Sequence, residues 1–156
     1  MVSGLDLIAD GRSFALTDLD RDGGVDIVVV NANAPLLQVL SNQIGSQQGF
    51  VAVRLEGGNT AADSDSEWSN RDGVGARLSL RAGELNSLRE LQFGEGLAAQ
   101  NSETLVIGLG GAKNADEIVV RWPSGRTQQI EQVESGSLVV FRESADVVVG
   151  AYNSAD

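Results

Sequence analysis

The chain has 156 residues, a length that suits one domain or a small domain with an appended segment. Acidic residues outnumber basic residues by 22 to 11, and the formal net charge of −11 disfavours binding to nucleic acid or to an anionic membrane surface. The sequence contains no His and no Cys, which excludes a Ser-His-Asp triad, a Cys-His dyad, the usual zinc sites and any disulfide within the chain. No run approaches the ~18 apolar residues of a membrane span, so we expect no membrane insertion.

Short apolar runs separated by Gly-containing turns recur along the chain and predict β-strands. In chain order these runs are residues 13–17, 27–30, 36–40, 50–55, 77–81, 105–109, 118–122 and 138–141. A single helical turn is compatible with residues 83–91, where Leu85, Leu88 and Leu91 recur at a spacing of three. The regular strand and turn spacing predicts an all-β fold, either an antiparallel β-sandwich or a partly open barrel.

Polar segments between the runs indicate how the chain is divided. A stretch rich in Asn, Gln, Gly and Ser marks a boundary at residues 41–49, so we expect an N-terminal hairpin unit at residues 1–45 and a β-domain at residues 46–145. Residues 146–156 form a tail with one candidate edge strand. Within the β-domain, Trp122-Pro123-Ser124-Gly125 predicts a β-turn inside a hairpin of residues 121–130, and Trp122 is expected in the core.

One loop, residues 18–26, has carboxylates at its first, third, fifth and ninth positions. These residues are Asp18, Asp20, Asp22 and Asp26. Oxygen ligands at alternate positions of a turning chain suit Ca²⁺, and Gly23 and Gly24 let the backbone aim a carbonyl inward, which we expect at Gly24. Without a cation the charges would repel each other, by roughly 1 kcal/mol per pair at ~4 Å even in bulk water. The sequence therefore predicts one Ca²⁺ bound by the four carboxylates and Gly24.

The surroundings of this loop distinguish it from an EF-hand. An EF-hand needs a Glu at position 12 and a following helix, whereas position 12 here is Val29, inside a β-branched run. The loop is therefore expected to join two strands as a calcium-binding β-hairpin. The alternative is an Asp/Gly-rich turn that binds nothing tightly.

The loop and its flanking runs resemble the FG-GAP/VCBS type of β-propeller repeat, whose Ca²⁺ loop has the pattern D-x-D-x-D-G-x-x-D. Every fixed position of that pattern is matched, and the resemblance implies side-chain ligands from the four Asp and a backbone ligand at Gly24. The Phe-Gly of the repeat is altered to Phe14-Ala15, and its Gly-x-Pro to Asn33-Ala34-Pro35. One repeat cannot form a propeller, so the chain is expected to be the C-terminal part of a larger β-propeller protein.

A second resemblance covers about residues 50–142. The segments Asn70-Arg71-Asp72-Gly73-Val74-Gly75-Ala76-Arg77 and Arg121-Trp122-Pro123-Ser124-Gly125-Arg126 are similar to the ASPIC/UnbV domain, which follows such repeats in bacterial secreted proteins and in cartilage acidic protein. Residues 105–110 stand where that family has an HFGLG-like stretch, here without the His and Phe. The resemblance implies a class of module and not a reaction.

These features predict a non-catalytic, calcium-binding interaction or adhesion module, extracellular or on the cell surface, with an unknown protein or glycan ligand. Residues 1–6 lack the basic and apolar regions of a signal peptide, so an export signal is expected upstream. Two alternatives are a carbohydrate-binding module that uses Trp68, and a glycoside hydrolase that uses two carboxylates such as Asp65 and Glu67. The acidic cluster at residues 63–67 is otherwise expected to be a solvated loop.

Overall fold

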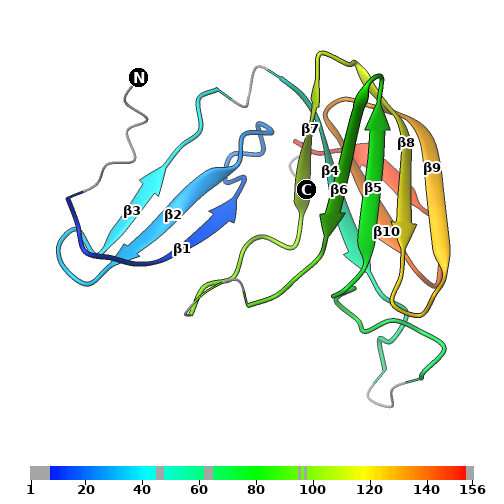
Figure 1. Ribbon diagram of the computed structural model, residues 1–156, viewed down its shortest axis with the longest axis horizontal. Coiled ribbons are helices and arrows are strands. Elements are labelled where there is room, and N and C mark those ends of the chain that lie inside the picture. The colour runs from blue at the N-terminus through cyan, green and yellow to red at the C-terminus, as the bar shows by residue number, and fades with distance from the viewer. Residues whose placement is uncertain (1–7, 45–47, 62–64, 95, 97, 154–156) are drawn as a thin grey trace.

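The computed structural model describes residues 8–44, 48–61, 65–94, 96 and 98–153. Within these residues the chain forms eleven strands in three sheets and no helix (Figure 1). The two larger sheets make a sandwich that is not closed into a barrel. The predicted all-β sandwich is therefore confirmed.

The N-terminal sheet has three antiparallel strands in the order β1-β2-β3. Its strands are β1 (Gly11–Thr17), β2 (Asp26–Asn31) and β3 (Leu37–Leu40). The aliphatic run of β2 is central and pairs on both sides, as in the row formed by Ala15, Val28 and Val39. Figure 1 shows this sheet beside the sandwich, with the loop between β1 and β2 directed toward the sandwich.

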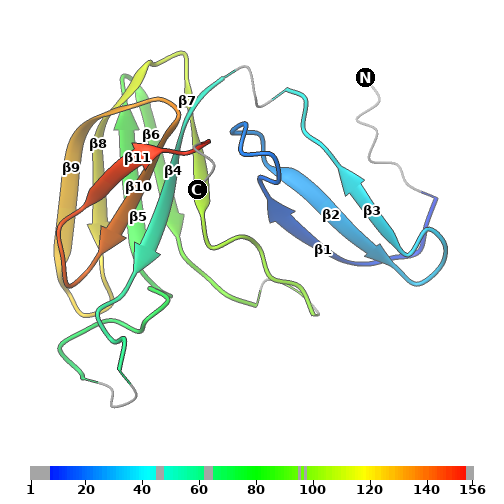
Figure 2. The ribbon, with the colours of Figure 1, turned by 180° about the vertical axis from the view of Figure 1, so that it is seen from behind.

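The sandwich consists of a sheet in the order β11-β10-β4-β7 and a sheet in the order β6-β5-β8-β9, which face each other (Figures 1 and 2). Its strands are β4 (Gly49–Glu56), β5 (Arg77–Ala82), β6 (Leu85–Glu90), β7 (Leu105–Gly110), β8 (Asn114–Arg121), β9 (Thr127–Glu134), β10 (Ser137–Arg142) and β11 (Val148–Ala151).

The core lies between these two sheets because their strands alternate buried apolar and exposed polar residues. In β5 the buried Leu78 and Leu80 pair with the buried Val120 and Ile118 of β8, while the Arg and Ser residues between them face solvent. Trp122 is 3 % exposed and belongs to the same cluster, as predicted. The facing sheet contributes Val51, Val53, Leu55, Ile107, Leu109, Val139 and Phe141.

One strand pair of the sandwich is parallel. β10 lies alongside β4 in parallel register from Ser137 opposite Val51 to Arg142 opposite Glu56. The sandwich therefore contains one parallel pair besides the predicted antiparallel pairs. This parallel pair joins segments that are more than 80 residues apart in the chain. β11 extends the same sheet as an antiparallel edge strand.

The helical turn expected within residues 83–91 is wrong, because this segment forms β6. Ala82 and Leu85 are partners across a two-residue connection, and Gly83 at its first position has a φ of 57°. That placement of Gly is typical of a type II′ hairpin turn. The spacing of Leu85, Leu88 and Leu91 has a different origin: the first two are exposed on β6, and the third is buried beyond its end.

The hairpin expected at residues 121–130 is confirmed by the pairing of β8 with β9. The Trp122 amide donates to the Arg126 carbonyl at 2.9 Å, and the Gly125 amide donates to the Trp122 carbonyl at 2.9 Å. Both bonds close the turn that contains Pro123 and Gly125. This turn places Ser124 beside the loop that follows β4.

Candidate metal centre

The acidic loop joins β1 to β2 and is held in shape by its first carboxylate. Asp18 is buried, and its two oxygens accept the amides of Asp22 and Gly23 at 3.2 and 2.9 Å. Two residues of the loop have positive φ, Arg21 at 58° and Gly23 at 90°. These backbone turns fold the loop around Asp18 instead of letting β1 continue.

Three of the predicted carboxylate ligands are brought together. One oxygen from each of Asp18, Asp20 and Asp22 lies within 4.8 Å of the other two. Asp18 is buried, Asp22 is half-buried and Asp20 is exposed, so the group opens toward solvent on one side. The Gly24 amide donates to Asp22 Oδ1 at 2.7 Å, which fixes the third carboxylate.

Asp26, the predicted fourth carboxylate ligand, lies outside this group of three. It is 2 % exposed, and its oxygens accept the amides of Leu19 at 3.0 Å and Asn42 at 2.8 Å. Asp26 thus ties the start of the loop and the segment after β3 to the first residue of β2. Gly24 is buried close by, where a Cβ would lie 2.8 Å from the Asn42 carbonyl oxygen.

The electrostatics of the loop disfavour its negative charges when no cation is present. Burial raises the pKa of Asp18, and the charges of Asp22 and Asp20 raise it further, against the opposing hydrogen bonds from the Gly23 and Asp22 amides. Since like charges at this spacing repel each other, a divalent cation among the three carboxylates would favour their ionised form.

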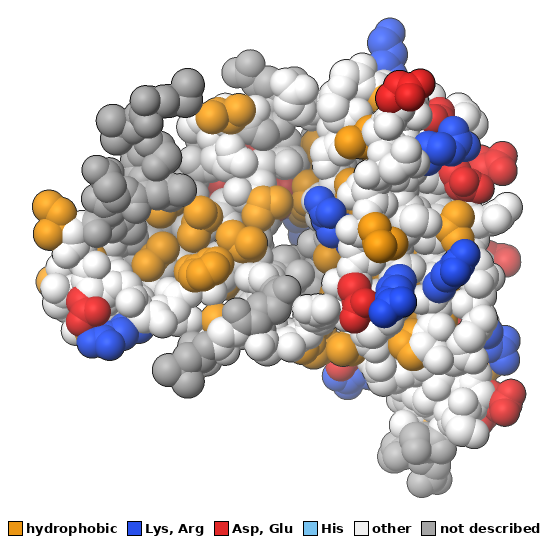
Figure 3. All heavy atoms as spheres, viewed as in Figure 1, with side chains coloured by type: hydrophobic (Ala, Val, Ile, Leu, Met, Phe, Trp, Pro, Cys, Tyr) orange, Lys and Arg blue, Asp and Glu red, His pale blue; other side chains and the backbone are white. Residues whose placement is uncertain are grey.

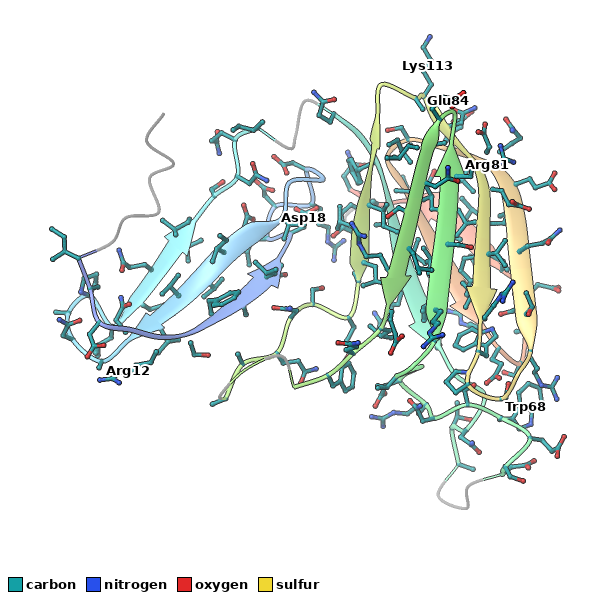
Figure 4. The ribbon with its side chains drawn as sticks, in the orientation of Figure 1. Arg12, Asp18, Trp68, Arg81, Glu84 and Lys113 are labelled. Atoms are coloured by element: carbon teal, nitrogen blue, oxygen red, sulfur yellow. The ribbon has the colours of Figure 1, made fainter. Side chains whose placement is uncertain are left out.

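The loop also contacts the sandwich. Gly23 packs so closely on the Phe50 ring that a Cβ there would overlap the ring. Phe50 in turn makes an edge-to-face contact with Tyr152, with ring centroids 5.7 Å apart. Tyr152 is buried, and its pKa is raised to about 12 by burial and by the charge and hydrogen bond of Asp18. Figure 4 shows Asp18 at the end of β1 that faces the sandwich.

A second contact joins the N-terminal sheet to the segment before β7. The Leu16 amide donates to Asn101 Oδ1 at 2.8 Å, and the Ser102 amide donates to the Leu16 carbonyl at 2.9 Å. These bonds pair the outer edge of β1 with residues 101–102. Beside them lies a cavity of about 300 Å³, lined by residues of β1, β6 and β7 and by Asp18.

The second acidic cluster is a turn at the other end of the sandwich. Residues 63 and 64 lie outside the described residues, whereas Asp65 and Glu67 are both exposed. Asp65 Oδ1 accepts the Glu67 amide at 2.9 Å, and the Asp65 amide donates to Asn59 Oδ1 at 2.7 Å. The bonds of Asp65 therefore form the turn itself.

Trp68, the predicted sugar-contacting side chain, is partly covered. The Arg126 guanidinium lies 3.9 Å from its ring centroid, and Gly58 packs on the ring so closely that a Cβ there would overlap it. Trp68 is half-buried at the far end of the sandwich from Asp18 (Figure 4). These contacts leave Trp68 less of its ring surface for stacking on a ligand than an exposed loop residue would offer.

One buried acid was not identified from the sequence. Glu143 is 6 % exposed, accepts the amides of Gly58 and Ser69 at 2.9 and 2.8 Å, and accepts the hydroxyls of Ser69 and Ser124. Burial favours its neutral form, but these bonds together lower the pKa of Glu143. Glu143 therefore joins the end of β10 to the loop after β4 and to the turn at Pro123. In the sequence, Glu143 follows an apolar run and is indistinguishable from an ordinary polar residue at the end of a strand.

The fold and the loop together define an all-β module whose acidic loop lies where a small sheet meets a β-sandwich. A family model described as ASPIC and UnbV matches residues 66–148, from the turn before β5 to the start of β11. The match spans more than half of the chain, and the chain belongs to this family. No curated protein matches the sequence.

The acidic loop and the whole N-terminal sheet lie outside the matched residues. The resemblance of that part to an FG-GAP/VCBS repeat therefore stays a prediction. In the part of the chain that the structure describes, no helix is long and apolar enough to cross a membrane.

Proposed function

We propose that this chain is a non-catalytic, calcium-binding interaction module whose ion is held by the loop between β1 and β2. The observation that carries the proposal is the convergence of Asp18, Asp20 and Asp22, whose carboxylate oxygens lie within 4.8 Å of one another. Carboxylate oxygens in excess are the donor set that Ca²⁺ prefers, whereas Mg²⁺ demands a smaller and more hydrated octahedron.

The five predicted ligands have different roles in this arrangement. The three converging carboxylates would supply charge and side-chain oxygens, and the Gly24 carbonyl remains the predicted backbone ligand. Asp26 would act mainly on the shape of the loop, because it lies outside the group of three and its oxygens accept the amides of Leu19 and Asn42. The ion would offset the mutual repulsion that contributes to the raised pKa of Asp18.

A thermal unfolding experiment with calcium and with a chelator tests the proposal. At free Ca²⁺ of 100 times the dissociation constant, binding adds about 2.7 kcal/mol to the free energy of unfolding. For a chain of this size that corresponds to a rise in Tm of roughly 5–11 °C. We expect Asp20→Asn to remove most of this rise, because it removes one of the three converging carboxylates. The fold should be retained, since Asp20 is exposed and lies outside the core of the sandwich.

The matched control is Asp146→Asn, which alters an exposed acid far from the loop in sequence and should respond to Ca²⁺ as the parent chain does. Calorimetric titration with Ca²⁺ gives the affinity directly. A melting temperature that is the same in chelator and in millimolar Ca²⁺, together with no heat of binding, would refute the calcium site.

We also propose that the module is extracellular and forms the C-terminal part of a larger β-propeller protein. Support comes from the N-terminal sheet, where apolar side chains are exposed on both faces: Phe14 on one, and Val30, Leu37 and Val39 on the other. Figure 3 shows hydrophobic side chains gathered over this sheet. Neighbouring sheets of a propeller would cover such faces. Further D-x-D-x-D-G-x-x-D loops in the preceding part of the gene would support this, and their absence would contradict it.

The non-catalytic assignment rests on residue types. Without His or Cys, the common nucleophile and base pairs cannot be assembled from this chain. A panel of glycan and ester substrates is the direct test, and turnover that survives repurification and disappears in a carboxylate variant would overturn the assignment.

A further inference from the structure

In the turn Asn70-Arg71-Asp72-Gly73, the first and last residues stabilise the turn, and the side chains of Arg71 and Asp72 do not. The Asn70 side chain bonds the Val74 carbonyl at 2.8 Å and the Val74 amide at 2.9 Å. Gly73 has a φ of 67° and a position where a Cβ would lie 3.2 Å from the Trp122 ring. The side chains of Arg71 and Asp72 bond each other, at 2.8 Å from Nε to Oδ1.

These two charged side chains line an open hollow on the sandwich, beside the end of β4. The Arg71 side chain is 72 % exposed, so its pairing with Asp72 contributes little to stability. The hollow has a volume of about 370 Å³, within the ~300–1,000 Å³ typical of small-molecule sites. Its polar side chains are those of Arg54, Glu56, Thr60, Arg71, Asp72 and Glu103.

Arg54 is the side chain in this hollow with the most unused bonding capacity. Its Nε lies 3.6 Å from Glu56 Oε1 and its Nη2 lies 3.8 Å from Glu103 Oε2, both beyond hydrogen-bonding distance. The other oxygen of Glu56 is bonded by Arg142 Nε at 2.8 Å. Among the described residues, Arg54 thus has two ion-pair neighbours but no hydrogen bond to either of them. Its planar guanidinium is suited to binding a carboxylate through two parallel hydrogen bonds.

The mixture of charges around Arg54 restricts the ligand. Two guanidinium groups and three carboxylates line the hollow, so it has no excess of positive charge for a compact multivalent anion such as phosphate. A ligand with one carboxylate and several hydroxyls suits both kinds of group, because its carboxylate accepts from Arg54 and its hydroxyls donate to Asp72 and Glu103. Thr60 adds a neutral hydroxyl on the rim.

We propose that this hollow binds a saccharide carrying a uronic acid group, with the sugar carboxylate on Arg54 and the sugar hydroxyls on Asp72 and Glu103. The proposal rests on the assignment of the chain as an interaction module but not on the calcium site, whose residues are absent from the hollow.

Nuclear magnetic resonance titration of the isotope-labelled full chain tests the proposal at constant ionic strength, with sodium glucuronate, glucose and sodium acetate as separate probes. We expect glucuronate to bind at least tenfold more tightly than glucose or acetate, with saturating shifts at Arg54 and Arg71. Acetate binding as tightly as glucuronate would overturn the proposal, because the site would then read a carboxylate alone. Glucose binding as tightly as glucuronate would overturn it as well.

Variants locate the site. Arg54→Gln should weaken glucuronate binding at least tenfold, and Glu103→Gln should reduce the preference for glucuronate over acetate about threefold. The matched control, Arg121→Gln, changes an exposed Arg on the outer face of the other sheet and should bind as the parent chain does. Equal losses in Arg54→Gln and Arg121→Gln would refute a specific site. Repeating the titration in chelator separates this result from calcium binding, since glucuronate affinity is expected to be unchanged there.

Discussion

Glu143 offers the most sharply defined test of how this fold is held together, because four hydrogen bonds from three separate residues converge on one buried carboxylate. In Glu143→Ala the amides of Gly58 and Ser69 lose their acceptor. Each unmet donor of this kind costs about 1–3 kcal/mol, so the two together lower the free energy of unfolding by about 2–6 kcal/mol. The Ser69 and Ser124 hydroxyls can rotate toward each other or toward water and add less.

Glu143→Gln separates charge from shape. Its carbonyl oxygen can take the place of Oε2 and keep both amides, while its NH₂ group faces two serine hydroxyls that are able to accept. The variant loses the added strength of bonds to a charged acceptor, roughly 1 kcal/mol per bond. We therefore expect Glu143→Gln to fall between the parent chain and Glu143→Ala.

The pH dependence has a defined sign. The pKa of Glu143 is lowered in the folded chain from an ordinary value of 4.5, so its ionisation stabilises the fold above pH 4.5 and this contribution is lost as the pH falls through the folded pKa. Glu143→Gln lacks the ionisation, so the stability gap between it and the parent chain should narrow in acid.

Urea unfolding followed by tryptophan fluorescence, from pH 7 downward, measures all three effects. The control Glu84→Ala, at an exposed residue in the turn before β6, should stay within about 0.5 kcal/mol of the parent chain. The reasoning is refuted if Glu143→Ala costs less than about 1 kcal/mol at pH 7, or if Glu143→Gln is as damaging as Glu143→Ala.

Two further predictions concern the contact between the acidic loop and the sandwich. Gly23→Ala places a Cβ at a φ of 90° and against the Phe50 ring, which should weaken the contact between the loop and the sandwich. The amides of β1 to β3 should then exchange hydrogen faster, while those of β5 and β8 do not. Unchanged exchange in β1 to β3 would contradict the contact. Tyr152→Phe keeps the ring beside Phe50 but removes the hydroxyl bonded to Asp18. In chelator it should lower the urea midpoint by an amount equivalent to about 1–3 kcal/mol. An unaltered midpoint would show that the hydroxyl does not contribute to stability.

The strands were predictable where the sequence has a clear period, and less so elsewhere. β5 alternates strictly and β2 is a compact aliphatic run, and both lie where those patterns indicate. β6 was misread because three Leu at a spacing of three outweighed the two-residue turn at Gly83. The parallel pairing of β4 with β10 has no local signature at all, since it depends on which distant strand fills the gap in the sheet.

The candidate site was predictable in composition but not in geometry. Spacing identifies four Asp in one loop, and three of them converge. It does not show that Asp26 is engaged by the amides of Leu19 and Asn42, because Asn42 reaches it only after β3 has formed. The same holds for Glu143, whose partners come from the loop after β4 and from the turn at Pro123, which meet only in the folded sandwich.

The contacts of Asp18 and Gly23 with the sandwich make the loop part of two equilibria at once: its occupation by a cation and the docking of the N-terminal sheet. If Ca²⁺ binds the docked loop more tightly than the free one, docking must raise calcium affinity by the same factor as calcium favours docking. Tyr152→Phe changes no carboxylate and no residue of the loop, so a weaker calcium affinity in this variant can arise only through this linkage or through a shift of Asp18 itself. Gly23→Ala also strains the loop backbone and the amide that bonds Asp18, so it cannot separate these causes. A loss of affinity in Tyr152→Phe together with faster hydrogen exchange in β1 to β3 would assign the coupling to docking, whereas a loss without faster exchange would assign it to the hydrogen bond on Asp18.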